Sequence, residues 1–313
     1  MHSSAHYRQL LTRLPQIAVA ADQFQILSSA KDFKSRILSL IAHATQRIYL
    51  IALYLQDDEA GREILSALYA AKQRNPSLDI KVFVDFHRAQ RGLIGKGKQG
   101  GNHLMYQAMA ASHQHQIEIY GVPVKGRELL GVLHLKGFIF DDTLLYSGAS
   151  LNDIYLHQQE RYRFDRYHQI HSPALTRSMV NYVDDVFLGS EAVQRLDRTG
   201  IPGAKQLKGP IRRFKQRLRL CQYRFESIQP NDREIAVTPM VGLGKRGNQL
   251  NRMIRNLVRA TEREIFICTP YFNPPKELNK DVEALLKRGC KVTIVVGDKT
   301  ANDFFIPPEV KFS

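Results

Sequence analysis

The chain has 313 residues, which suggests about two domains at roughly 150 residues each. Apolar residues make up 43% and charged residues 24%, a balance typical of a core-forming globular protein and not of a disordered one. The 45 lysines and arginines exceed the 30 acidic residues, and the net charge of +15 favours a polyanionic partner, either nucleic acid or an anionic membrane surface.

The three cysteines, Cys221, Cys268 and Cys290, are too few and too scattered for a disulfide framework or a cysteine-based zinc site, which fits a reduced cytosolic setting. The first 23 residues lack the apolar core of a secretory peptide. The longest apolar run, residues 48–55, is far below the roughly 20 residues that span a bilayer. Any contact with a membrane is therefore expected at its surface.

Two stretches of the chain, 32–55 and 248–272, repeat one pattern at a constant offset of 217 residues. Each reads as an amphipathic helix followed by a buried strand, so that Ile37 matches Ile254 and Ile48 matches Ile265. A second helix and a second strand follow in both copies. Chance similarity of apolar patterns is the alternative to duplication. Alternating helices and buried strands predict an α/β fold of duplicated halves, each a mixed sheet with flanking helices.

The repeat also predicts how the chain is divided. We expect a first half over residues 1–204, a basic helical connector over 205–235 and the start of a second half over 236–313. His134 lies 53 residues after Lys81, and the same spacing from the matching Lys291 reaches position 344, beyond Ser313. The second half is therefore expected to be incomplete and to lack its counterpart of His134.

The connector contains a basic amphipathic helix. Residues 205–220 include seven basic residues and no acid, and Ile211, Phe214 and Leu218 fall on one helical face. One interpretation is a solvated helix docked by these three apolar residues. Another is a helix at an anionic membrane, where each basic residue adds about 1 kcal/mol; nucleic-acid backbone contact would give the same pattern. The expected membrane-contact residues are Arg212, Arg213, Lys215, Arg217 and Arg219.

The stretch "GVLHLKGFIFDD" carries the candidate chemistry. If it forms a strand, His134 and Lys136 share one face. An unpaired buried ammonium is expensive, so the pair is expected to line a cleft that holds an anion. Phosphate suits it, because a neutral imidazole can attack phosphorus and a lysine neutralises the charge on the phosphoryl oxygens. Asp141 either orients an imidazole or belongs to a plain hairpin turn.

His134, Lys136 and Asp141 form the motif HxKxxxxD, by which the chain resembles the phospholipase D superfamily. Further blocks, among them "YGVPV", "ICTPYF" and "VVGDKTANDFFIP", make it similar to the bacterial CDP-diacylglycerol–serine O-phosphatidyltransferases of that superfamily. The resemblance implies that one histidine attacks the phosphatidyl phosphorus and releases CMP, and that L-serine then takes up the phosphatidyl group. A second motif's histidine would act as general acid and base. No metal and no other cofactor is implied.

Two features depart from the family pattern. Residues 148–152 read GASLN where relatives often have G-S-x-N, so that Ser150 and Asn152 are both candidate substrate-binding residues. The chain contains one HxKxxxxD motif, whereas such synthases carry two.

Arg88 and Arg91, just past the carboxyl end of a predicted strand, are candidates to bind the diphosphate or the head group. A solvated loop is the alternative for these two arginines.

A segment rich in tyrosine and arginine, residues 155–167, suits a lipid interface, a platform for single-stranded nucleic acid or an edge strand with exposed charge.

The favoured hypothesis is a phosphatidyltransferase with the substrates CDP-diacylglycerol and L-serine, acting from the cytoplasm at the inner face of the membrane. The alternatives are another superfamily phosphodiesterase or nuclease, for which nucleic acid is the less favoured partner, and an inactive truncated fragment that binds membranes.

Overall fold

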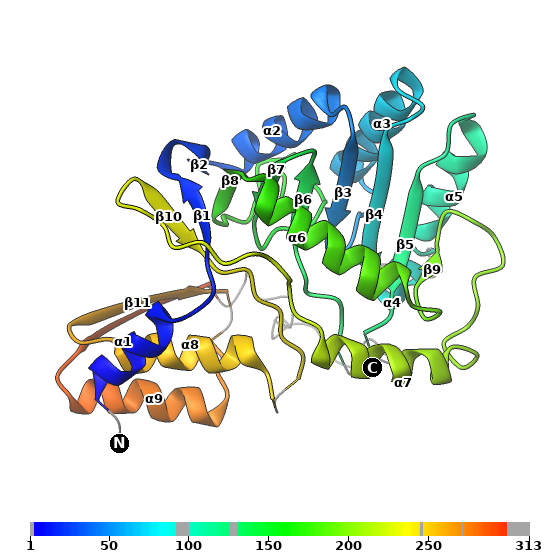
Figure 1. Cartoon of the computed structure of the whole chain (residues 1–313). Helices are drawn as coiled ribbons and strands as arrows, with labels where there is room; N and C mark the ends of the chain where they lie inside the picture. The colour runs from blue at the N-terminus through cyan, green and yellow to red at the C-terminus, as the bar shows by residue number, and fades with distance from the viewer. Residues whose placement is uncertain (1–2, 92–99, 125–130, 245–246, 271, 299–313) are drawn as a thin grey trace. The chain divides into compact units, whose positions relative to one another are not determined.

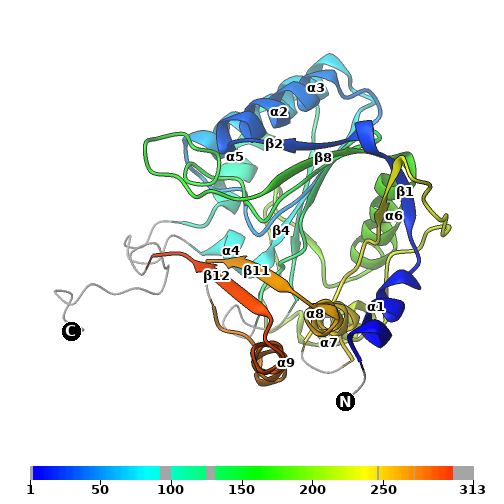
Figure 2. The same ribbon diagram turned by 90° about the vertical axis from the view of Figure 1, so that its left-hand side faces the viewer.

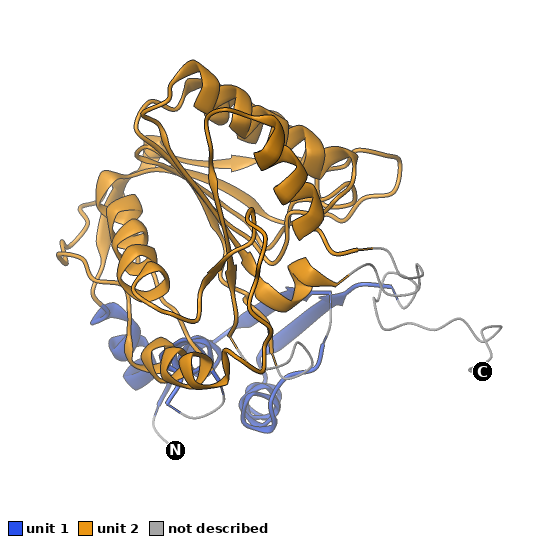
Figure 3. Ribbon diagram, turned by 90° about the vertical axis from the view of Figure 1, so that its right-hand side faces the viewer, with its two compact units in different colours: residues 1–14, 244–313 blue, residues 15–243 orange. Residues whose placement is uncertain are grey.

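The computed structural model describes the whole chain except residues 1–2, 92–99, 125–130, 245–246, 271 and 299–313 (Figure 1). Residues 15–243 form one compact unit, and residues 1–14 together with 244–313 form the other (Figure 3). The larger unit contains the whole HxKxxxxD motif.

Eight of the described strands form one mixed sheet in the larger unit, in the order β2-β8-β7-β6-β3-β4-β5-β9. Strands β3, β4 and β5 are parallel, whereas β6, β7, β8 and β2 continue the sheet as antiparallel neighbours on one side. Strand β9 pairs antiparallel with β5 on the other side. The strand bounds are β2 (Phe24–Leu27), β3 (Arg47–Ile51), β4 (Asp79–Asp85), β5 (Glu118–Val122), β6 (Gly137–Phe140), β7 (Thr143–Tyr146), β8 (Tyr167–His171) and β9 (Gln194–Arg195).

Helices cover both faces of this sheet, with α2, α3 and α5 on one face and α6 on the other (Figures 1 and 2). Helix α2 packs through one apolar face, because buried side chains recur along it at helical spacing: Phe33, Ile37 and Ile41. Its first turn is capped by the Ser29 hydroxyl, which accepts from Asp32 N. The helices are α2 (Ala30–His43), α3 (Glu59–Arg74), α4 (Phe86–Gln90), α5 (His103–Ser112), α6 (Pro173–Val183), which continues into a π-helical turn (Asp184–Leu188), and α7 (Lys208–Leu220).

A two-stranded ladder joins the beginning and the end of the larger unit. Strand β1 (Ile17–Ala20) pairs antiparallel with β10 (Glu234–Val237), and Ile17 lies opposite Val237. A short 3-10 turn (Ala21–Gln23) leads from β1 into β2.

The smaller unit repeats the α–β–α–β order of α2-β3-α3-β4. Its elements are α1 (Ser4–Thr12), α8 (Gln249–Ala260), β11 (Glu264–Thr269), α9 (Lys276–Lys287) and β12 (Lys291–Val296). Strands β11 and β12 are parallel, as β3 and β4 are. The expected α/β fold with flanking helices is confirmed. The sequence repeat matched Lys291 with Lys81, but the strand pairing matches it with Asp79. Lys291 lies opposite Glu264 at the start of β11, and Asp79 lies opposite Arg47 at the start of β3.

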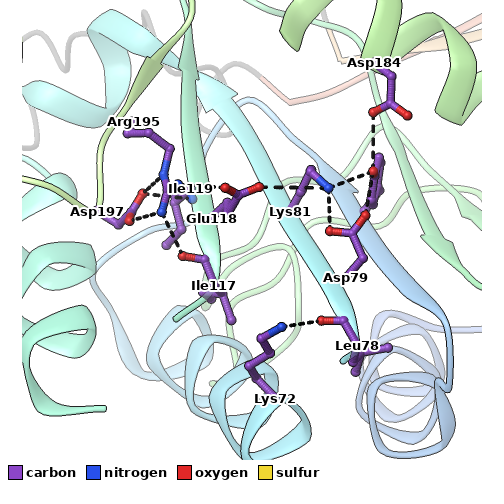
Figure 4. Close-up of polar contacts among 11 residues, drawn as sticks. Lys72, Leu78, Asp79, Lys81, Ile117, Glu118, Ile119, Asp184, Arg195 and Asp197 are labelled. Carbon is purple, nitrogen blue, oxygen red and sulfur yellow. Dashed lines mark hydrogen bonds and ion pairs between the residues drawn. The ribbon is translucent and has the colours of Figure 1, made fainter. Parts of the chain in front are cut away.

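A charged network crosses the amino ends of the parallel strands (Figure 4). Lys81 Nζ donates to Tyr49 Oη at 2.9 Å, pairs with Asp79 and lies 3.9 Å from Glu118. Arg195 pairs with the same Glu118 at 2.8 Å. Burial and the carboxylate of Asp79 raise the pKa of Tyr49. Each of these charges therefore has a partner of opposite sign, which offsets part of the cost of removing it from water.

Among the described residues, none of the helices combines the length and the apolar character that crossing a membrane requires.

Candidate active site

The His134–Lys136 pair lies in the segment directly before β6 and not inside a strand. The expectation of a strand with both side chains on one face was therefore wrong. Strand β6 begins only at Gly137, whose φ of 142° is a conformation that side-chain-bearing residues rarely adopt, so the strand alternation does not extend back to Lys136. Since β6 is antiparallel to β3, with Gly137 opposite Ile51, the pair lies at the carboxyl end of the parallel strands.

The two side chains of the pair differ in exposure. The imidazole of His134 is exposed, whereas Lys136 is only 8% exposed and its Nζ donates to the His134 carbonyl at 3.2 Å. Neighbouring protein groups still exclude enough water from His134 to lower its pKa, and the charge of Lys136 lowers it further. Burial lowers the pKa of Lys136 to about 8. The arrangement therefore favours a neutral imidazole beside a mostly cationic lysine at neutral pH.

Asp85 fixes the backbone next to the imidazole, and it was not among the predicted site residues. This aspartate is 0% exposed at the end of β4. Its Oδ2 accepts from Leu133 N at 2.8 Å, while its Oδ1 caps α4 by accepting from His87 N at 3.0 Å and Arg88 N at 2.8 Å. A carboxylate shared by three backbone N–H groups is a strong, directional tether. Asp85 therefore sets the position of the residue that precedes His134.

Asp165 is a second acidic residue that the predicted site did not include. Its negative charge raises the pKa of Lys136, opposing the effect of burial. A Cβ placed on Gly148 would lie 2.7 Å from Asp165 Oδ2, so the glycine leaves room for this carboxylate. The only signal for Asp165 in the sequence is weak, because this residue lies between Phe164 and Arg166 in a segment with no regular periodicity.

The carboxylate of Asp141 lies in the β6–β7 turn, at the other end of β6 from Lys136. It accepts from the backbone N–H groups of Thr45, Gln46 and Arg47 at 2.8–2.9 Å. These bonds lower its pKa, although burial acts in the opposite direction. Asp141 itself has a φ of 51°, which aspartate tolerates better than most residues. Of its two interpretations, these contacts fit the hairpin turn.

Arg88 and Asn152 belong to one polar cluster beside the motif. The guanidinium of Arg88 lies 4.7 Å from the centre of the Tyr54 ring, and its Nη2 donates to Gln56 Oε1 at 3.1 Å. Gln56 in turn donates to Asn102 Oδ1 at 2.9 Å. Asn152 Nδ2 reaches Tyr54 Oη at 3.5 Å. The guanidinium is therefore held in place by an aromatic face and an amide before any ligand binds.

The remaining candidates lie at different depths. Ser150 is buried, and the neighbouring Leu151 pairs with the segment of Tyr54 and Gln56 through two backbone hydrogen bonds. Arg91 is half-buried at the end of α4. Among the described residues, histidine, cysteine and acidic side chains do not gather in groups of three that could hold a metal ion.

Helix α7 buries Ile211, Phe214 and Leu218, as its apolar spacing indicated. Two of its basic residues are engaged inside the larger unit: Arg213 pairs with Glu191 at 2.5 Å, and Arg217 donates to the Gly189 carbonyl at 3.0 Å. Arg212 and Arg219 are exposed and Lys215 is half-buried.

Residues 37–160 match the family model described as "Cardiolipin synthase, PLD-like domain", which agrees with this fold and motif and identifies a phospholipase D-like protein. The chain is 46% identical over 308 residues to a CDP-diacylglycerol–serine O-phosphatidyltransferase of Haemophilus influenzae, with 97% of this chain and 68% of that protein covered. It is also 46% identical to the enzyme of the same name from Escherichia coli, covering 98% of this chain and 68% of that protein. The chain belongs to the family of CDP-diacylglycerol–serine O-phosphatidyltransferases.

A solved structure agrees with this assignment. The crystal structure of phosphatidylserine synthase from Haemophilus influenzae matches with a TM-score of 0.90 and 43% identity, covering 100% of this chain and 70% of that one. The phospholipase D-like fold expected from the sequence is thereby confirmed.

Proposed function

We propose that this protein transfers the phosphatidyl group of CDP-diacylglycerol to L-serine, giving phosphatidylserine and CMP. The observation that carries the proposal is the His134–Lys136 pair, an exposed imidazole next to a buried lysine at the carboxyl end of the parallel strands. Two relatives that are 46% identical to the chain are named for this reaction.

In the first step, the neutral imidazole of His134 attacks the phosphatidyl phosphorus. A nitrogen–phosphorus bond forms, the bond to the bridging oxygen breaks, and CMP leaves with that oxygen. The lowered pKa of His134 keeps its lone pair available at neutral pH. Lys136 neutralises the charge on the phosphoryl oxygens, and losing one such preorganised partner typically costs about 3–4 kcal/mol of transition-state stabilisation.

In the second step, the serine hydroxyl attacks the phosphorus of the phosphatidyl-histidine and His134 is released. General acid–base help with the hydroxyl proton contributes roughly 10²–10⁴-fold. The family resemblance assigns this role to the histidine of a second HxKxxxxD motif, and the 313 residues contain one such motif.

We further propose Arg88 as the residue that binds the carboxylate of serine. Its guanidinium is already oriented by Tyr54 and Gln56, and a planar guanidinium binds a carboxylate through two parallel hydrogen bonds. Since Lys136 already serves the phosphate, a second fixed cation is available for the acceptor. Arg91, Ser150 and Asn152 complete the proposed substrate-binding set.

The proposed site of action is the inner face of the cell membrane, approached from the cytoplasm. The net charge of +15 supports attraction to anionic lipid, and the basic face of α7 is the proposed contact through Arg212, Arg213, Lys215, Arg217 and Arg219. Arg212 and Arg219 are the strongest candidates in this set, because they are exposed.

The test is incubation of the purified chain with CDP-diacylglycerol and labelled serine, followed by chromatography of the lipids. Phosphatidylserine formation that His134→Asn abolishes is the expected result, together with a protein–lipid adduct that carries label from acyl-labelled CDP-diacylglycerol and is trapped by rapid denaturation in detergent without acid. Cleavage of DNA without any phosphatidylserine would replace the proposal with a nuclease.

A further inference from the structure

The segment from Arg161 to Arg166, which leads into β8, exposes its aromatic side chains to solvent. Phe164 is 74% exposed and Tyr162 is 47% exposed. Two of the charged residues alternate with the rings and are half-buried: Arg163 Nη1 donates to Tyr155 Oη at 3.4 Å, and Asp165 lies against Gly148. A segment in water normally buries its rings and exposes its charges. The reversal indicates that something apolar covers the outer side.

The exposed rings are held in place. The ring of Tyr162 stacks on His157 with their centres 3.8 Å apart, and Phe164 meets Tyr167 edge-on at 6.4 Å. The backbone is tied down as well, because Arg163 N donates to the Ile154 carbonyl at 3.1 Å. Preorganised rings lose little conformational entropy when they enter an apolar phase, which favours a binding role.

Positive charge flanks the two rings. Arg161 and Arg166 are both exposed, one on each side of Tyr162 and Phe164. Aromatic rings beside basic side chains suit the headgroup region of an anionic bilayer, where the rings meet the acyl boundary and the arginines meet lipid phosphates. Burial of a side chain the size of phenylalanine in the apolar phase stabilises such a contact.

Within the same segment, Asp165 follows Phe164 directly, and its negative charge raises the pKa of Lys136. We propose that residues 161–166 form a membrane-inserting rim, with Tyr162 and Phe164 in the headgroup region of an anionic bilayer and the His134–Lys136 pair at lipid-phosphate level. The inference rests on the proposed function, because a lipid substrate keeps its acyl chains in the bilayer while its phosphorus reaches the imidazole. It adds a second contact surface to the one proposed above for α7.

The absence of tryptophan from the sequence permits a direct test. Phe164→Trp gives a single tryptophan in the rim, and Ile228→Trp gives an exposed control. With vesicles of phosphatidylglycerol and phosphatidylethanolamine, the emission of the Phe164→Trp variant should shift to the blue and be quenched by brominated acyl chains. The Ile228→Trp emission should stay unchanged, and phosphatidylcholine vesicles should give a weaker response.

Three results would overturn the proposal: sedimentation with vesicles while the Phe164→Trp emission stays unchanged, absence of vesicle binding, or a shift caused by single-stranded DNA and not by vesicles. Fluorescence needs no turnover, so failure of the rim is distinguished from failure of the proposed reaction. A second measurement compares substrates. Phe164→Asp should lower the ratio of activity on vesicle substrate to activity on a short-chain, water-soluble substrate by roughly tenfold, and Phe164→Leu should preserve that ratio.

Discussion

Replacing Lys136 with methionine is expected to stabilise the protein while it abolishes phosphatidyl transfer. Burial lowers the pKa of this lysine from 10.5 to about 8 in the folded chain. Each pKa unit corresponds to about 1.36 kcal/mol, so keeping the ammonium buried at pH 7 costs about 3 kcal/mol. Methionine retains a flexible apolar stem and carries no charge. Its free energy of unfolding at pH 7 should therefore exceed that of the parent by up to about 3 kcal/mol.

The stability penalty of the buried Lys136 ammonium depends on pH. The folded chain holds the Lys136 proton more weakly than the unfolded chain does, so the penalty is fully present below pH 8. It shrinks as the pH rises from 8 toward 10.5, because the folded chain loses the proton over that range while the unfolded chain still keeps it. Denaturant titrations followed by circular dichroism at pH 7 and pH 10 should show the advantage of the variant shrinking with pH.

Lys81→Met is the matched control, because Lys81 is a second poorly exposed lysine that has acidic partners. Its ammonium pairs with Asp79, lies 3.9 Å from Glu118 and donates to Tyr49. Removing it leaves these groups without their cation and should destabilise the chain by about 1–3 kcal/mol. If Lys136→Met lowered stability at pH 7 as Lys81→Met does, the argument that the active-site ammonium is held at a penalty would be refuted.

Three further variants test the surroundings of the site. Asp85→Asn can still cap α4 but turns an N–H toward Leu133 N, so turnover should fall roughly 10²-fold from misplacement of the imidazole; Ser29→Ala, which removes the side-chain cap of α2, should leave turnover per folded molecule nearly unchanged. Arg88→Lys should raise KM for serine at least tenfold while sparing cleavage of CDP-diacylglycerol by water, and a loss of both activities would assign the arginine to the diphosphate. Gly137→Ala should lower the free energy of unfolding by about 1–3 kcal/mol in thermal or denaturant melts, because its φ of 142° disfavours a side chain, and unchanged stability would contradict that conclusion.

Local patterns in the sequence were sufficient for the fold class and for the motif. Helical spacing at Phe33, Ile37 and Ile41 and the matched strands of the repeat are properties of short windows, so the α/β order could be predicted from them. The docking residues of α7 followed from the same periodicity.

The supporting residues of the site depend on contacts between distant segments. Asp85 acts through Leu133 N, and Asp141 acts through amides at the start of β3, so neither role follows from the neighbouring sequence. The strand expected through His134 failed because the pattern of apolar residues does not reveal the positive φ at Gly137. Local alternation looked regular there, whereas the backbone conformation changed.

The pairing of β1 with β10 has a consequence for how the chain is made. Ile17 emerges from the ribosome about 220 residues before its partner Val237. At roughly 5–20 residues per second, β1 waits on the order of 10–40 s for that partner. Helix α1 waits longer still, because Ser4 and Arg8 both bind Glu262. The N-terminal segment therefore remains available to chaperones until these partners have been made, and a chain cut at residue 204 would leave β1 with an unpaired edge prone to aggregation.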